Sequence, residues 1–188
     1  VRLLEIMQGD EIQTRNFDTL VELIAPSTDD VIIDNGASSF VPLTHYLISN
    51  QVPALLQEME HEMVVHTVIT GSQALLDTVS GFAQLASQFP AEALFVVWLN
   101  PFWGSIEHEG KNFEQMKAYT ANKARVSAIV NIPALKEDTY GRDLSDMLQE
   151  RLTFDEALAM DSLTIMTRQR LKIVKGQLFS QLDSAAVL

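Results

Sequence analysis

Four short aliphatic runs mark the first two-thirds of the chain. They are rich in Val and Ile, and none alternates cleanly between apolar and polar positions. Strands that are covered on both faces of a parallel sheet have this pattern. The pattern therefore predicts four buried strands, at residues 31–34, 63–69, 93–99 and 126–130, with residues 2–6 as a weaker fifth candidate.

Helical patterns occupy the intervals between these runs. In residues 72–89, for example, Leu75, Val79 and Phe82 lie on one stripe at steps of three and four residues. Further helices are expected over residues 17–24 with Asn16 as the cap, 52–61 with Pro53 in the first turn, 113–125 with Asn112 as the cap, 140–151, 155–159 and 162–182.

The spacing of the expected strands indicates their topology. Successive strands begin roughly 30 residues apart, which is the length of one strand–helix–strand unit, and strands joined in this way run parallel. No linker rich in Gly, Ser or Pro divides the chain. We therefore predict one α/β domain over residues 1–188, with a doubly wound, mostly parallel sheet, helices on both faces and a helical tail from about residue 140.

Composition narrows the class of protein. Apolar residues make up 47% of the chain, which is enough to build a core, and there is no cysteine, which excludes disulfides and thiolate metal sites. The net charge of −12 repels the DNA backbone. The most apolar stretch, residues 93–99, is far shorter than the roughly 20 residues that span a bilayer. We expect a cytoplasmic protein without membrane insertion.

Candidate site residues follow the expected strands, because ligands of open parallel sheets bind beyond the carboxyl ends of the strands. Asp34 could hold Mg²⁺ through water, or it could cap a helix or bond to the loop at Asn35 and Gly36, which is the more common use of such a residue. Asn100 could contact a base, or more commonly the backbone of a neighbouring loop. The residues from Thr70 to Ser72 could cap the helix that follows.

Two phosphate-binding motifs are missing from the sequence. It contains neither G-x-x-x-x-G-K-[ST] nor G-x-G-x-x-G, and its first lysine is Lys111. No nucleophile elbow of the form G-x-S-x-G is present either. A nucleotide site therefore cannot be completed from this chain alone.

Four longer stretches resemble a known family. They are VIIDNGASSFVPLT at residues 31–44, AEALFVVWLNP at 91–101, IPAL at 132–135 and YGRD at 140–143. The chain is similar over essentially its whole length to the TraL family of conjugative-plasmid transfer proteins, within the ParA/MinD-like P-loop ATPases. Such proteins open with a strand, a phosphate loop of deviant Walker type and a helix. The resemblance implies a P-loop NTPase-like fold from which this first βα unit has been lost by truncation at the N-terminus.

The resemblance also implies roles for single residues. Asp34 matches the acidic residue that organises Mg²⁺, Asn100 the residue that contacts adenine, and Ile132 and Pro133 the turn that packs near the base. The family often has a proline-rich switch after the acidic residue, where this chain has Asn35, Gly36, Ala37 and Ser38, and Pro101 stands where a basic residue is usual. We expect ATP and Mg²⁺ to bind the complete protein, and neither to bind this chain alone.

The last expected helix carries a basic stripe. Arg168, Lys172 and Lys175 share one face, roughly opposite Leu171 and Val174. Such a stripe is usually a solvated helix face, and the alternative is a contact with a partner protein or, weakly, with DNA.

Two hypotheses for function remain open. The complete protein is an ATP- and Mg²⁺-dependent switch of plasmid transfer with at most slow hydrolysis, or it is a non-catalytic adaptor that keeps the fold to bind other proteins of the conjugation machinery. Self-association or binding of other transfer proteins is expected in both cases. The sequence that precedes Val1 in the complete protein discriminates between the two, since a phosphate loop there favours the switch.

Overall fold

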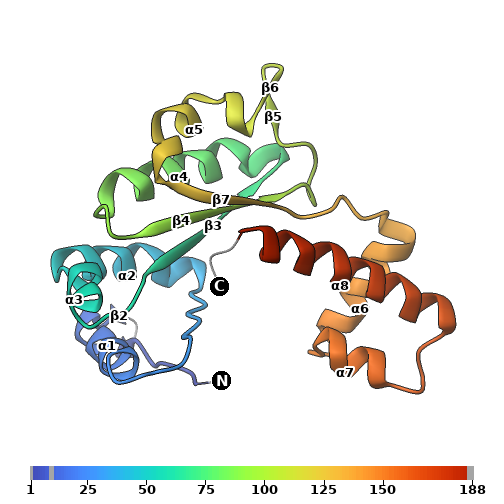
Figure 1. Ribbon diagram of the computed structural model, residues 1–188, viewed down its shortest axis with the longest axis horizontal. Helices are drawn as coiled ribbons and strands as arrows, with labels where there is room; N and C mark the ends of the chain where they lie inside the picture. The colour runs from blue at the N-terminus through green and yellow to red at the C-terminus, as the bar shows by residue number, and fades with distance from the viewer. Residues whose placement is uncertain (1, 9–10, 186–188) are drawn as a thin grey trace. The chain divides into compact units, whose positions relative to one another are not determined.

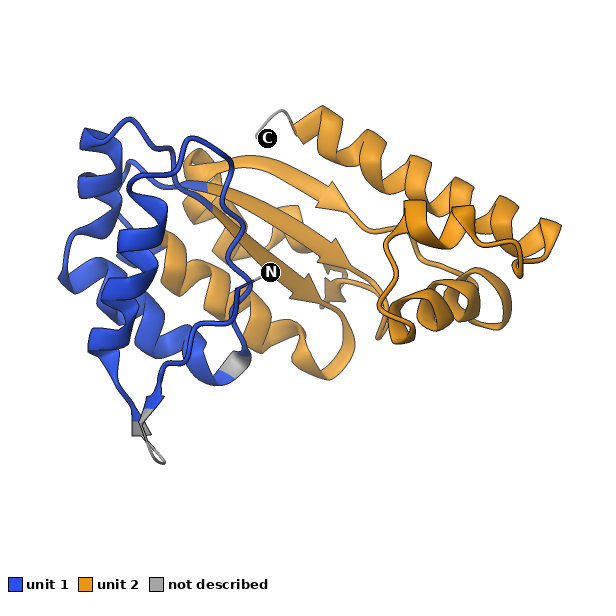
Figure 2. Cartoon of the chain, turned by 90° about the horizontal axis from the view of Figure 1, so that it is seen from below, with its two compact units in different colours: residues 1–64, 87–94 blue, residues 65–86, 95–188 orange. Residues whose placement is uncertain are grey.

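The structure, a computed structural model, describes residues 2–8 and 11–185. It divides into two compact units, which Figure 2 shows in two colours. Unit 1 consists of residues 1–64 and 87–94, and unit 2 of residues 65–86 and 95–188. Each unit is described by itself below.

The centre of unit 2 is a three-stranded parallel sheet in the order β3-β4-β7 (Figure 2). Its strands are β3 (Val64–Thr70), β4 (Leu94–Asn100) and β7 (Val126–Asn131). Three of the four expected strands are thereby confirmed, as is the α/β fold class. The register of β4 and β7 places Val97 opposite Ile129 and Leu99 opposite Asn131.

One face of the sheet is covered by α4 (Leu75–Gln88), which follows the short 3₁₀ helix η2 (Ser72–Ala74). The apolar stripe of this helix packs on Ile69 and Val97, as the sequence pattern predicts. Phe82 meets Phe113 edge to face, with ring centroids 5.6 Å apart. Figure 1 shows α4 and α5 on this side of the sheet.

The helix expected over residues 113–125 is broken into three short pieces. After the hairpin of β5 (Glu107–His108) and β6 (Lys111–Asn112) come η3 (Phe113–Gln115), α5 (Lys117–Asn122) and η4 (Lys123–Arg125). Asn112 caps η3 through a capping box with Gln115, so the cap is confirmed. Met116 leaves the helical conformation with ψ 149°, and its side chain joins Phe113 in the core. Core packing therefore overrides the continuous helix.

The tail of unit 2 forms a small helical cluster. The π-helical turn η5 (Glu137–Gly141) leads into α6 (Arg142–Gln149), α7 (Phe154–Ala159) and α8 (Ile165–Ala185). Met147, Ala157 and Leu171 form its buried centre. The side chain of Gln181 accepts a hydrogen bond of 3.1 Å from the backbone N–H of Asn131, which holds α8 against β7 (Figure 1). The helical tail is thus confirmed, with slightly shifted bounds.

Unit 1 is built mainly from helices. The two-residue strands β1 (Met7–Gln8) and β2 (Glu11–Ile12) pair antiparallel and are followed by η1 (Thr14–Phe17), α1 (Asp18–Ile24), α2 (Ala37–Ser49) and α3 (Val52–Glu58). Its core contains Ile24, Val52 and Leu56. The Tyr46 hydroxyl donates to Asp18 over 2.7 Å, and burial together with this acidic partner raises the pKa of Tyr46 to about 12.

Three expectations for unit 1 are wrong, and one helix was missed. Residues 31–34 form no strand, nor do residues 2–6, because a strand requires a ladder of backbone hydrogen bonds with a neighbouring strand, and the described residues form no such ladder there. Asn16 does not cap α1, since it lies inside η1 and donates its amide to the Glu5 carbonyl. The sequence patterns also missed α2, whose interior proline, Pro42, disguises a helix.

Candidate functional site at the carboxyl edge of the sheet

The carboxyl ends of the three parallel strands lie at one edge of unit 2. The strands end at Thr70, Asn100 and Asn131, and their connecting loops meet beyond that edge. Open α/β sheets bind ligands in this position. It is therefore the first place to search for a site.

Asn100 uses its side-chain oxygen within its own loop. The Oδ1 atom accepts a hydrogen bond of 3.1 Å from the backbone N–H of Phe102, as Asn commonly does at a turn. The sequence favoured a backbone contact with a neighbouring loop, and the structure shows a backbone contact within the residue's own loop instead. The Nδ2 group has no hydrogen-bond partner in the part of the chain that the structure describes, so it remains able to donate.

Ile132 and Pro133 lie beside Asn100. The backbone N–H of Ile132 donates to the carbonyl of Leu99 over 3.0 Å, which extends the pairing of β4 and β7 past the end of β7. Both Ile132 and Pro133 are half-buried. The structure thus brings three of the expected site residues together at one edge.

The turn after β3 differs from the expected cap. Gly71 is the first residue of the turn, no side chain caps η2, and the hydroxyl of Thr78 instead accepts from the N–H of Thr70 over 3.2 Å. Ser72 has a φ of +62°, in the left-handed region. The cap at residues 70–72 is therefore wrong, because the chain turns too sharply there for a side chain to reach the first helical N–H groups.

Two glycines allow the loops after β3 and β4 to touch. A Cβ on Gly71 would lie 2.1 Å from the carbonyl oxygen of Gly104, so no other residue fits at position 71 without movement. Gly104 itself has a φ of +137°, which strains any other residue. Sequence reasoning missed this contact because each glycine is isolated in its own loop.

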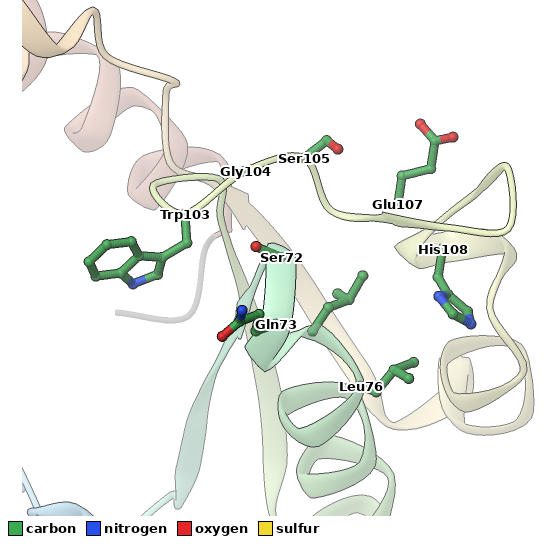
Figure 3. Close-up of a pocket in the computed structure, with 9 residues that line it drawn as sticks. Ser72, Gln73, Leu76, Trp103, Gly104, Ser105, Glu107 and His108 are labelled. Atoms are coloured by element: carbon green, nitrogen blue, oxygen red, sulfur yellow. The ribbon is translucent and has the colours of Figure 1, made fainter.

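An open cleft of about 450 Å³ lies between these loops and the start of α4 (Figure 3). We call it the edge cleft, and it is lined by Ser72, Gln73, Leu75, Leu76, Trp103, Gly104, Ser105, Glu107 and His108. Figure 3 shows Trp103 at one end, with Glu107 and His108 at the other. Sequence reasoning did not single out these residues. The sequence signal for this cleft is the triplet Phe102-Trp103-Gly104, which lies one residue after the end of β4.

Asp34 lies in unit 1, away from any strand or helix. It is exposed, within residues 28–36, which form neither element. Gly36 rather than Asp34 is the first residue before α2, and Asn35 donates to the Gly36 carbonyl over 3.4 Å. The alternative roles for Asp34, a helix cap or a bond to this loop, are therefore not found in the described structure.

The expected switch loop lies partly in a helix. Asn35 and Gly36 precede α2, whereas Ala37 and Ser38 belong to its first turn. Ser39 binds the Gly36 carbonyl through both its N–H and its hydroxyl. In the structure this segment is thus a helix start and only in part a loop.

The basic stripe of α8 makes contacts inside the tail. Arg168 donates to the carbonyl of Met160 over 2.7 Å, and Lys175 pairs with Asp155 over 2.5 Å. Lys172 is exposed. Two of the three basic groups therefore help to hold the helical cluster, in addition to any external contact they make.

On β3 and β4, an indole and an imidazole are hydrogen-bonded to each other. Trp98 Nε1 donates to His66 Nδ1 over 2.9 Å. Partial burial lowers the pKa of His66 below its ordinary value of 6.5. A proton on Nδ1 would end this bond, so the structure holds His66 in its neutral form.

Comparison with models of known protein families gives no match, and no solved structure matches either. Two curated proteins of Escherichia coli, both named Protein TraL, do match. They are 84% and 79% identical to the chain over all 188 of its residues, which cover 78% of each relative. The chain belongs to the TraL family. Both TraL proteins are longer than the matched region.

At the carboxyl edge of this TraL-family chain, the free Nδ2 of Asn100 is a hydrogen-bond donor next to the half-buried side chains of Ile132 and Pro133. No group of three or more His, Asp or Glu residues that could hold a metal ion occurs among the described residues, and Asp34 is a lone carboxylate.

Within the described ranges, no helix of the TraL-family chain has both the length and the apolar character needed to cross a bilayer. This agrees with the short apolar runs of the sequence.

Proposed function

We propose that this chain forms the larger part of an ATP- and Mg²⁺-binding switch protein of plasmid conjugal transfer. The observation that carries the proposal is the carboxyl edge of a parallel sheet at which Asn100 and Ile132 lie side by side. Membership of the TraL family supports the assignment to conjugation. The phosphate-binding segment would come from a part of the complete protein outside these 188 residues.

In this proposal the base is bound by unit 2. Asn100 donates from Nδ2 to a ring nitrogen, while Ile132 and Pro133 pack against the ring. Asp34 holds Mg²⁺ through water once the phosphates supply further oxygen ligands. The binding or loss of the charged phosphates of ATP would change the conformation of the protein. Hydrolysis would be slow, because no described residue is positioned as a base for an attacking water.

A second function, that of a non-catalytic adaptor, is favoured by one observation. Asp34 lies exposed in a segment without a strand, and no described residue of unit 1 makes a hydrogen bond that fixes the direction of its carboxylate. A metal ligand is normally held in place by surrounding structure. In the adaptor, the α/β frame would serve to bind other transfer proteins and the nucleotide residues would be vestigial.

Calorimetric titration with MgATP tests the two functions. We expect no binding to this chain and micromolar binding to a longer TraL-family protein that includes the residues upstream of Val1. In that longer protein, Asn100→Ala would weaken binding about tenfold through the loss of one well-placed hydrogen bond. Asn50→Ala, which changes an exposed Asn in unit 1, is the matched control and leaves the affinity unchanged. Absence of binding by the longer protein would establish the adaptor.

A further inference from the structure

Two large aromatic side chains are exposed at the edge cleft. Phe102 is 71% and Trp103 68% exposed, and their rings pack edge to face with centroids 4.7 Å apart. Leu76, at the floor of the cleft, is also exposed. Exposed aromatic residues beside a cleft mark binding surfaces, since Trp supplies much contact area for little loss of side-chain freedom. Because Phe102 and Trp103 are exposed and do not belong to the core, they are available to contact a ligand or partner.

The rim of the cleft has a fixed shape. Gly71 and Gly104 bring the two loops into direct contact, and the loop from Phe102 to Ser105 is anchored at its start by the Asn100 side chain. A ligand would therefore find the groups of the cleft already in place, which lowers the entropy lost on binding.

The charge around the cleft has one dominant sign. Within unit 2, the two segments that form the cleft, residues 65–86 and 95–110, contain three Asp and Glu and no Lys or Arg. Glu107 lines the cleft, and Asp77 and Glu109 are exposed nearby in the sequence, while Lys111 is the first cation that follows.

A cleft that carries both an exposed aromatic ring and carboxylates favours a cationic ligand over a phosphate. The face of an indole attracts Arg and Lys, and it also stacks on nucleobases. A nucleotide, however, would bring its phosphates toward Glu107, which has no ion-pair partner among the described residues. A basic segment would gain from both groups, with one cation at the ring and another toward the carboxylate. The charge therefore decides between the two ligands.

We propose that the edge cleft binds an extended basic segment of a partner protein. One Arg or Lys lies over the ring of Trp103, and the next cation along the segment lies toward Glu107 at the opposite end of the cleft (Figure 3). This inference does not depend on ATP binding.

The test uses Trp103 as its own reporter. The chain has two tryptophans, and a Trp98→Phe background leaves only the exposed one. A capped peptide of alternating Arg and Gly is titrated while the fluorescence is followed, with a peptide of alternating Gln and Gly as the uncharged control. We expect a saturable change with the Arg peptide alone, weakened by salt because the contact is partly ionic.

Variants then locate the contact. Measured by calorimetry, Trp103→Ala and Glu107→Gln would each weaken binding of the Arg peptide about two- to fivefold, and together about tenfold. Matched controls are Phe179→Ala, another exposed aromatic residue, and Glu150→Gln, another exposed carboxylate, and both retain the affinity.

Three results would overturn the proposal. The Gln peptide could bind as well as the Arg peptide, or the double variant could bind like the unaltered chain. The third is that adenosine monophosphate changes the fluorescence of Trp103 while the Arg peptide does not, which would assign the aromatic pair to a base. Far-UV circular dichroism of each variant confirms that the fold is retained.

Discussion

Two apolar triplets of this chain look alike in sequence and differ in the fold. Val31, Ile32 and Ile33 are 45%, 88% and 42% exposed, whereas Phe95, Val96 and Val97 are completely buried. In both cases the apolar run leads to an Asn, at Asn35 and Asn100, and both runs were expected to be buried strands. Only the second has β3 and β7 on its two sides.

An apolar run therefore forms a strand only where other strands lie beside it to complete its backbone hydrogen bonds. Such a run is compatible with burial, but its N–H and C=O groups need a ladder on each side, and its side chains need a helix on each face. Unit 2 supplies both for the second triplet. Unit 1 supplies neither in its described residues, so the first triplet is extended and exposed.

The largest expected difference concerns two isoleucines: Ile69 from an expected strand that forms, β3, and Ile32 from the expected strand that does not. Ile69→Ala in β3 removes a completely buried side chain from the main core and should lower the free energy of unfolding by about 2–5 kcal/mol. Ile32→Ala changes an exposed side chain and should cost less than about 0.5 kcal/mol. Urea denaturation followed by circular dichroism measures both. Equal losses would show that residues 31–34 are buried in solution.

A smaller difference is expected between the glycines that follow the two runs. Gly71→Ala places a Cβ against the Gly104 carbonyl and should cost about 1–3 kcal/mol, because two backbones must separate. Gly36→Ala, at the start of α2, meets no atom within 4 Å and should cost less than about 1 kcal/mol. The same denaturation assay tests this pair. A Gly71→Ala variant as stable as the unaltered chain would show that the two loops do not touch.

The smallest expected effect is a pH dependence that only the formed sheet provides. Because His66 in β3 has a pKa below 6.5 when folded, the unfolded chain binds its proton more readily, and stability falls as the pH drops below about 6.5. His66→Gln should flatten this part of the profile. Denaturation midpoints between about pH 7.5 and 5.5 measure the slope. A slope that persists in His66→Gln would assign it to other groups.

Much of unit 2 could be predicted because its signals are local. Three aliphatic runs, the stripe of α4 and the Asn112 cap are patterns within a few residues, and all three kinds reappear in the structure. The break at Met116 was not predictable in this way. It depends on a packing partner, Phe113, whose position is set by the core and not by helix propensity.

The candidate site shows the same limit. That Asn100 and Ile132 lie at one edge follows from strand order and parallel direction, so it could be predicted from two runs and their spacing. The edge cleft could not be, since it requires the contact between Gly71 and Gly104, residues far apart in the chain. Nor could the exposure of Asp34, which depends on what lies beside residues 31–34.

The sequence by itself determined the α/β class, three of the strands, the family and the acidic charge of the first 110 residues, because periodicity, similarity and charge are properties of the order of residues alone. Tertiary structure decided which aliphatic runs are buried, where the long helix breaks and where exposed aromatic rings meet carboxylates. These features depend on neighbours distant in the chain. A buried backbone N–H or C=O group needs a hydrogen-bond partner, and a buried side chain needs surrounding residues that fill the space around it. Both are determined only when distant segments pack together.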